Sequence, residues 1–128
     1  MRVLLDTHIA LWAVTAHVSL SPQAKKIILE ADEVFVSVAS TWEIAIKHSL
    51  GRGDMPVSAA QALLAFADAG YAMLDINPQH TLKVEALPPI HKDPFDRMLV
   101  AQALCEPLIL VTRNPQLAQY GAGILQVA

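Results

Sequence analysis

Short apolar runs alternate with longer amphipathic stretches along the chain. Five runs have the length of a strand, and the last is the weakest of them. They lie at residues 3–5, 34–36, 72–74, 108–111 and 124–127. Continuous apolar runs are typical of parallel strands whose two faces are both covered, whereas a half-exposed strand alternates apolar and polar residues. The pattern therefore predicts four to five buried strands in a mostly parallel sheet.

The stretches between these runs carry helix start signals. Serine, asparagine or aspartate precedes a helical pattern, several times with proline at the first helical position. The expected starts are Ser21 with Pro22, Ser37 or Ser40, Ser58, Asn77 with Pro78, and Asp93 with Pro94. Strands that alternate with helices favour right-handed crossovers and a sheet covered on both faces. We therefore expect residues 1–128 to form a single domain, a three-layer α/β/α sandwich around the mostly parallel sheet.

The composition points to a protein with a partner. Hydrophobic residues make up 54 % of the chain and charged residues 16 %, which is more apolar surface than one small core hides. We therefore expect an oligomer or an obligate partner. No apolar run approaches the roughly 20 residues of a membrane helix, and an acid at position 6 comes too early for a signal peptide. We therefore expect a cytoplasmic protein that does not associate with a membrane. Cys105 is the only cysteine, and we expect it in the core.

Several acids fall, by position, at one edge of the predicted sheet. The carboxyl ends of parallel strands meet at one edge, and ligands bind there. The residues expected at this edge are Asp6, Glu43, Asp93, Asp96 and, after Thr112, Asn114. The acids expected at the opposite edge, as solvated surface charges, are Glu30, Asp32, Glu33, Glu85 and Glu106. Asp54 is expected in a loop, and Asp68 and Asp75 at the surface.

Carboxylates that crowd together repel, and a hard divalent cation relieves the repulsion. Ligands that are all oxygen favour Mg²⁺ or Mn²⁺, which support phosphoryl chemistry by activating water. The net charge of −3 and the absence of a basic run count against a broad phosphate-binding surface. A nucleic-acid substrate would therefore need a metal or a partner to offset the acids.

Each acid also has a purely structural interpretation. Ser40 and Glu43 have the spacing of a capping box, in which the glutamate bonds back to the helix start. The other members are helix caps or first-turn charges in this interpretation: Asp6 before a helix at 7–12, Asp93, Asp96 and Asn114. The case for a metal site therefore rests on convergence of the acids.

Four segments together resemble the PIN domain, in particular the VapC-like ribonuclease toxins. They are LLDTH at 4–8, SVASTWEIAIKHSLG at 37–51, HKDPFDRMLVAQA at 91–103 and LVTRNPQLAQYG at 110–121. The resemblance implies a Mg²⁺- or Mn²⁺-dependent endoribonuclease that acts as the toxin of a toxin–antitoxin pair. Metal-activated water would hydrolyse an RNA phosphodiester and leave a 5′-phosphate and a 3′-hydroxyl. The implied partners are RNA, a cognate antitoxin and a second copy in a homodimer.

The resemblance also implies roles for individual residues. Asp6, Glu43 and Asp96 correspond to the acids around the ion. Asp93 would start the helix and support the site, and Thr112 would line the cleft. The family often has aspartate where this chain has Asn114, which can offer an oxygen but brings no charge. A PIN-fold protein with weak or no nuclease activity, which mainly binds its antitoxin, is therefore an alternative.

Other basic and apolar residues near these segments have weaker functional interpretations. For Arg97, Lys47 and His48, surface exposure or an ion pair is favoured over phosphate contact. His8 and His91 lack the spacing of a metal site. The apolar residues considered for an antitoxin groove, with the core as the alternative, are Trp12, Trp42, Ile46, Leu50 and Met55.

Two further classes fit less well. A receiver-like Mg²⁺-binding signalling module needs paired acids after the first strand, a phosphoacceptor aspartate after a middle strand and a late lysine. Here Asp6 stands alone, Ser37 follows the second strand, and Thr112 follows the fourth. A phosphohydrolase with a nucleophilic aspartate usually has a second acid two residues later, where this chain has His8.

Overall fold

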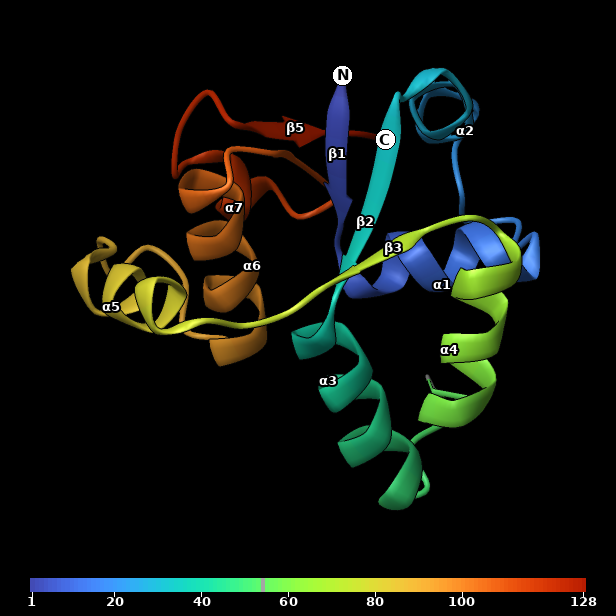
Figure 1. Cartoon of the computed structure of the whole chain (residues 1–128). Coiled ribbons are helices and arrows are strands. Elements are labelled where there is room, and N and C mark those ends of the chain that lie inside the picture. The colour runs from blue at the N-terminus through green and yellow to red at the C-terminus, as the bar shows by residue number, and fades with distance from the viewer. Residues whose placement is uncertain (54) are drawn as a thin grey trace.

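A parallel sheet runs through the middle of the protein (Figure 1). The computed structural model describes residues 1–53 and 55–128, so the prediction that Asp54 is a loop residue lies outside the described part. The strands are β1 (Arg2–Leu5), β2 (Glu33–Ser37), β3 (Ala72–Leu74), β4 (Ile109–Thr112) and β5 (Ile124–Gln126). Within the described residues they form one sheet in the order β3-β2-β1-β4-β5, and every neighbouring pair is parallel.

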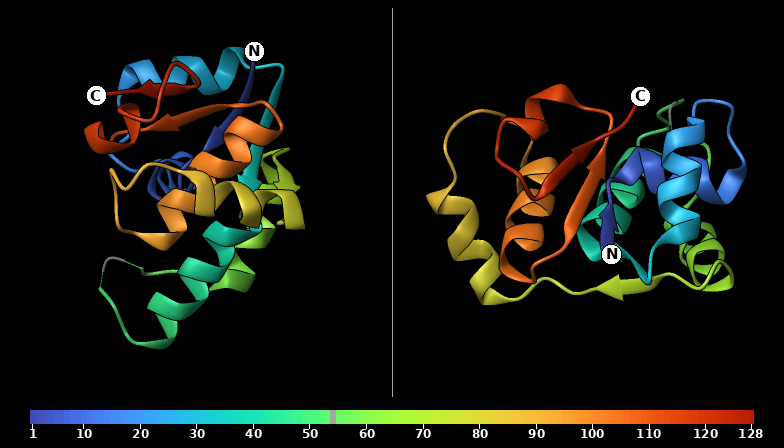
Figure 2. Two further views of the ribbon diagram at one scale, coloured as in Figure 1. Left: turned by 90° about the vertical axis from the view of Figure 1, so that its left-hand side faces the viewer. Right: turned by 90° about the horizontal axis from the view of Figure 1, so that it is seen from above.

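Helices cover both faces of this sheet. They are α1 (Thr7–Thr15), α2 (Pro22–Glu30), α3 (Val38–Ser49), α4 (Ala59–Asp68), α5 (Pro78–Ala86), α6 (Pro94–Cys105) and α7 (Pro115–Ala118). Seen from above, α5, α6 and α7 lie on one side of the sheet, and α1, α2 and α4 lie on the other (Figure 2). The predicted three-layer α/β/α arrangement is confirmed. Among the described residues, no helix combines the length and apolarity needed to cross a bilayer.

Alternate residues of β1 belong to different cores. Val3 and Leu5 pack with residues of α1, α2 and α4, whereas Leu4 packs with residues of α6 and α7, and all three side chains are fully buried. Successive side chains of a strand point to opposite faces, so a strand covered on both sides must be apolar throughout. This requirement explains the continuous apolar runs of the sequence.

The helix starts agree with the predicted caps. Side chains accept the backbone N–H of the first turn in each case, and the capping residues are Ser21, Ser37, Ser58, Asn77 and Asp93. Ser37 is therefore the start of α3, and Ser40 lies inside the helix. Gly51 and Gly70 follow the ends of α3 and α4 with φ of 71° and 82°, which glycine adopts without strain.

Two sequence expectations are wrong at the end of α6. Cys105 is exposed, and its thiol lies 4.0 Å from the carbonyl oxygen of Gln79 in α5 instead of in the core. Glu106 is not a solvated surface charge, since its Oε2 atom lies 2.6 Å from Nε2 of the fully buried His80. The backbone N–H of Asn77 donates to Nδ1 of His80, which leaves the ring proton on Nε2 to be donated to Glu106. The pair fastens the start of α5 to the end of α6.

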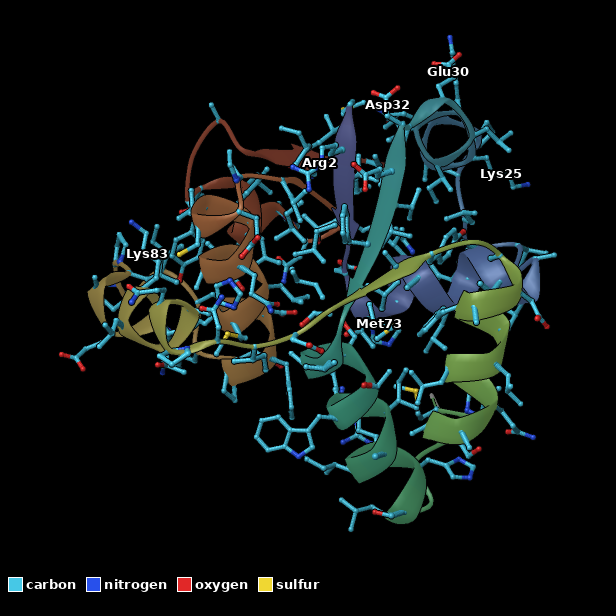
Figure 3. The ribbon with its side chains drawn as sticks, viewed as in Figure 1. Arg2, Lys25, Glu30, Asp32, Met73 and Lys83 are labelled. Carbon is cyan, nitrogen blue, oxygen red and sulfur yellow. The ribbon has the colours of Figure 1, made fainter. Side chains whose placement is uncertain are left out.

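Figure 3 shows Glu30 and Asp32 at the end of the molecule where β1 and β2 begin, away from α3. These acids and Glu33 and Glu85 are exposed, as expected.

Ala16 ends α1 in a left-handed conformation, with φ of 51° and ψ of 41°. This conformation brings the Cβ atom of any L-residue close to the backbone, so glycine is the usual residue at such a position. We expect Ala16→Gly to raise the free energy of unfolding by about 0.5–1 kcal/mol, measured by urea denaturation. The control Ala13→Gly, inside α1, should lower it by a similar amount. A loss of stability in Ala16→Gly would contradict this interpretation.

Candidate functional site

Asp6 lies directly after β1 and is held through both carboxylate oxygens. Oδ1 accepts the backbone N–H of Ile9 at 2.9 Å, so Asp6 caps α1. Oδ2 accepts the hydroxyl of Thr112, at the end of β4, at 2.6 Å. Burial raises the pKa of Asp6 above its usual value, while the hydrogen bonds from Thr112 and Ile9 oppose the shift. The cap is therefore real, and it places a poorly solvated carboxylate at the carboxyl edge of the sheet.

Glu43 lies in α3, and only 4 % of its surface is exposed. Oε1 accepts the hydroxyl of Thr7 at 2.7 Å, and Oε2 accepts Nζ of Lys47 at 2.6 Å. The capping-box interpretation of Ser40 and Glu43 is wrong, because α3 begins at Val38 and both residues lie within the helix. The ion pair expected for Lys47 is present. Glu43 is therefore directed toward the start of α1 instead of its own helix start.

Asp96 reaches the same region from the first turn of α6. Asp93 starts the helix, and its Oδ1 atom accepts the backbone N–H groups of Phe95 and Asp96 at 2.8 and 3.1 Å. Oδ2 of Asp96 lies 2.9 Å from Nε2 of His91. Asp93 is thus the predicted N-cap, and the start that it sets fixes the position of Asp96.

The three acids share one electrostatic environment. Desolvation, followed by the charge of Asp93, raises the pKa of Asp96 to about 6, while the hydrogen bond with His91 opposes the rise. The charges of Asp6 and Glu43 raise the pKa of Asp96 further, and the charge of Glu43 also raises that of Asp6. Asp6, Glu43 and Asp96 therefore lie near enough to one another for their charges to interact.

Protein donors occupy the carboxylate oxygens in this arrangement. Lys47 and Thr7 bond to Glu43, and His91 bonds to Asp96. Within residues 1–53 and 55–128, no three His, Cys, Asp or Glu side chains stand close enough together to hold a metal as they are. The acids nevertheless offer only oxygen atoms from desolvated, mutually repelling groups, and this donor set fits a hard divalent cation such as Mg²⁺ or Mn²⁺.

The comparison with protein families decides the classification. The model of the PIN domain matches residues 3–123. The chain belongs to the PIN domain family. It is 30 % identical over 119 residues to ribonuclease VapC22 of Mycobacterium tuberculosis, and the match covers 92 % of this chain and 91 % of that protein.

Solved structures share the fold of this PIN domain. VapBC2 of Rickettsia felis, bound to a DNA fragment from its promoter, has a chain that matches with a TM-score of 0.68 at 15 % identity. The match covers 99 % of this chain and 98 % of the other. A toxin–antitoxin complex from Klebsiella pneumoniae matches with a TM-score of 0.66 at 18 % identity, over 97 % and 96 % of the two chains. At these identities the likeness shows the fold alone.

Asn114 caps the last helix of the PIN domain. Its Oδ1 atom accepts the backbone N–H of Gln116 at 2.9 Å, and its own backbone N–H donates to the hydroxyl of Thr112 at 3.0 Å. Thr112 thus links Asn114 to Asp6. The capping interpretation is confirmed, and the neutral amide adds no charge to the acidic cluster.

Arg97 has a structural role in the PIN domain that sequence reasoning missed. Its guanidinium donates to the carbonyls of Val84 and Pro88 and to the hydroxyl of Tyr120, at 2.9, 3.0 and 3.1 Å. Tyr120 in turn accepts the backbone N–H of His91. Arg97 therefore ties α5 and the loop after it, which carries His91, to the start of α6. Only its place next to Asp96 hinted at a role near the site.

The raised pKa of Asp96 has a consequence for stability. A carboxyl that holds its proton more tightly in the folded state favours folding only when protonated, so stability falls as the pH rises from about 4 to about 6. Asp96→Asn removes this penalty and should raise the free energy of unfolding at pH 7.5 by roughly 2 kcal/mol, with no gain below pH 4. Urea denaturation in EDTA, at both pH values, measures the free energy of unfolding of the parent and of Asp96→Asn.

Asp68→Asn, at an exposed carboxylate of α4, is the matched control and should change stability little. A destabilised Asp96→Asn at pH 7.5 would show that the pairing with His91 outweighs the repulsion among the acids.

Proposed function

We propose that this PIN domain is a Mg²⁺- or Mn²⁺-dependent endoribonuclease, the toxin of a toxin–antitoxin pair. The observation that carries the proposal is that the charge of Glu43 raises the pKa of both Asp6 and Asp96, near the carboxyl edge of the sheet. The similarity to a protein named as a ribonuclease over 92 % of the chain supports the activity. Toxin–antitoxin complexes among the structures of the same fold support the biological role.

In this proposal the three acids hold the cation and the neighbouring residues place them. Thr112 orients Asp6 through its hydroxyl, Asp93 fixes the start of α6, and Thr7 orients Glu43. In the ion-free protein Lys47 pairs with Glu43 and His91 hydrogen-bonds with Asp96, and a cation held by these acids would replace both contacts. When bound, the ion activates water and neutralises charge on the scissile phosphate of RNA.

The exposed apolar surface supports an antitoxin partner. On α3, 60 % of Trp42 and 36 % of Ile46 are exposed, and 71 % of Leu50, directly after the helix, is exposed. The ring of Trp42 packs edge-on against Phe95, next to Asp96. We propose that the antitoxin, and the second copy in a homodimer, cover such surfaces. Met55 is buried in the core and does not belong to a groove.

The direct test is cleavage of a mixed-sequence RNA with Mg²⁺ or Mn²⁺. We expect products with 5′-phosphate and 3′-hydroxyl ends, no cleavage in EDTA, and recovery when Mg²⁺ is added in excess. Cleavage that persists in EDTA would exclude the metal mechanism. An inactive protein that still binds an antitoxin would favour the alternative, a PIN-fold protein that mainly binds its partner.

Asn114→Asp tests how the missing charge affects the site. Aspartate is an equally good N-cap, so α7 should be kept, while the added carboxylate should strengthen Mn²⁺ binding by roughly ten-fold. Isothermal titration with Mn²⁺ measures this, and cleavage at limiting Mn²⁺ should rise in parallel. Asn114→Ser, which caps without charge, is the control. Equal Mn²⁺ affinity in all three proteins would leave Asn114 as a helix cap alone.

A further inference from the structure

A hollow beside the acidic cluster has no part in the mechanism described so far. It measures about 380 Å³ and lies between α1 and Gly53, Pro56 and Val57. Its lining includes His8, Trp12, Thr15 and His17 from α1 and the loop after it. This volume lies within the range of small-molecule sites.

Planar and cationic groups gather around the ring of Trp12, one of the residues that line the hollow. The guanidinium carbon of Arg113 lies 5.0 Å from the ring centroid of Trp12. The ring of His17 is stacked with Trp12 at 5.7 Å and 22°, and the ring of His8 lies 5.8 Å away. Trp12 is half-buried, while Arg113 and His17 are exposed. The surface therefore combines aromatic planes with positive charge in a chain that is acidic overall.

The backbone holds this arrangement in place. The left-handed turn at Ala16 lets the N–H of His17 donate to the carbonyl of Trp12 at 3.0 Å, which returns the chain over the indole. Nδ1 of His17 accepts the N–H of Ser19, which fixes the ring plane. Arg113 follows β4 directly. The stacked groups are thus preorganised before any ligand binds.

The hollow is close to the acids along the chain. His8, which lines the hollow, follows Asp6 by two residues. Arg113 stands between Thr112, which bonds to Asp6, and Asn114. A strand of RNA with its scissile phosphate at the acids therefore has this hollow within reach of a neighbouring nucleotide.

We infer that the hollow is a subsite for an unpaired nucleobase of the RNA substrate, next to the scissile phosphate, in which the base takes the place of the exposed His17 ring on Trp12 and Arg113 supplies the cation. Sites for single-stranded nucleic acid combine aromatic stacking with arginine, and they need unstacked bases. The positive charge of Arg113 lies on the face of the Trp12 ring. Such a site needs no broad basic surface, which agrees with the net charge of −3. The inference rests on the proposed function for its substrate, but binding is measurable without cleavage.

The test uses the fluorescence of Trp12 in EDTA, where no metal-dependent cleavage occurs. The chain has two tryptophans, so Trp42→Phe leaves Trp12 as the only one. A single-stranded hexamer of adenylate is titrated into this variant, and stacking should quench the fluorescence in a saturable way. Adding Arg113→Ala should weaken binding of the hexamer by roughly ten-fold. Arg113→Lys keeps the charge but lacks the planar guanidinium, so its affinity should lie between those of the parent and Arg113→Ala.

Lys83→Ala is the matched control, since Figure 3 shows Lys83 on α5, across the sheet from α1. It should bind the hexamer as the parent does. No saturable quenching, equal affinity after Arg113→Ala, or equal quenching by duplex RNA would each overturn the inference. So would a response to an antitoxin peptide without one to the hexamer, which would assign the hollow to a protein partner.

Cleavage assays separate this inference from the proposed function. With Mg²⁺, Arg113→Ala should raise KM by roughly ten-fold and leave kcat within about two-fold, because the subsite binds substrate and transition state alike. If the hexamer quenches the fluorescence of a protein that never cleaves RNA, the proposed nuclease activity is refuted and the base subsite is supported. If RNA is cleaved and Arg113→Ala leaves KM unchanged, the nuclease activity is supported and the subsite is overturned.

Discussion

Asp6→Asn is expected to lower metal-dependent RNA cleavage by at least about 100-fold. Asparagine keeps an oxygen that can accept the N–H of Ile9, so the cap of α1 survives. It removes the negative charge that the site would use to hold the cation. Glu43→Gln should have an effect of similar size, because Glu43 is buried and faces the same region. The measurement is the initial rate of RNA cleavage at saturating Mg²⁺.

The control for both variants is Asp68→Asn, at an exposed acid of α4, which should cleave at the parent rate. Thermal unfolding should show that Asp6→Asn and Glu43→Gln remain folded. If either folded variant keeps more than half of the activity, that residue does not hold the ion.

Arg97→Met is expected to give the largest loss of stability, about 3 kcal/mol in urea denaturation. Methionine keeps much of the aliphatic length but removes every donor, so carbonyls of Val84 and Pro88 and the hydroxyl of Tyr120 lose a charged partner. Groups that lose a hydrogen bond in a partly buried setting carry their desolvation cost without compensation. The loop with His91 should loosen as well.

Arg2→Met is the comparison for this loss. Arg2 pairs with Glu33 at 3.1 Å, but both side chains are about half exposed, and exposed pairs contribute at most about 1 kcal/mol. Figure 3 shows Arg2 near the start of β1, away from the candidate site. A loss in Arg97→Met as small as that in Arg2→Met would refute the proposed role of Arg97 in fastening the loop.

Local sequence patterns were sufficient to predict the strands, the helix starts and the α/β/α architecture. Apolar runs gave the strands because a sheet covered on both faces needs apolar side chains at consecutive positions, as Val3, Leu4 and Leu5 show. Caps gave the helix starts because a serine or aspartate before a helix satisfies N–H groups that nothing else reaches. The edge rule for parallel sheets then placed the acids at one edge.

Tertiary partners were beyond the reach of these signals. Ser40 and Glu43 match a capping box, yet α3 starts at Val38, two residues before Ser40, because Ser37 at the end of β2 caps it. Glu106 and His80 are 26 residues apart in sequence, and the bond between them depends on how α5 packs on α6. The bonds of Arg97 depend likewise on the path of a distant loop. Such contacts follow from packing, which no local pattern encodes.

A structure of the protein crystallised with Mn²⁺ would show whether the three acids form a metal site. We expect one strongly held ion, located by its anomalous signal, with carboxylate oxygens of Asp6, Glu43 and Asp96 at about 2.1 Å. Nζ of Lys47 should then have left Glu43, its present partner at 2.6 Å. An ion bound elsewhere, or no ion at saturating Mn²⁺ while Lys47 still pairs with Glu43, would contradict the claim that these three acids form a metal site.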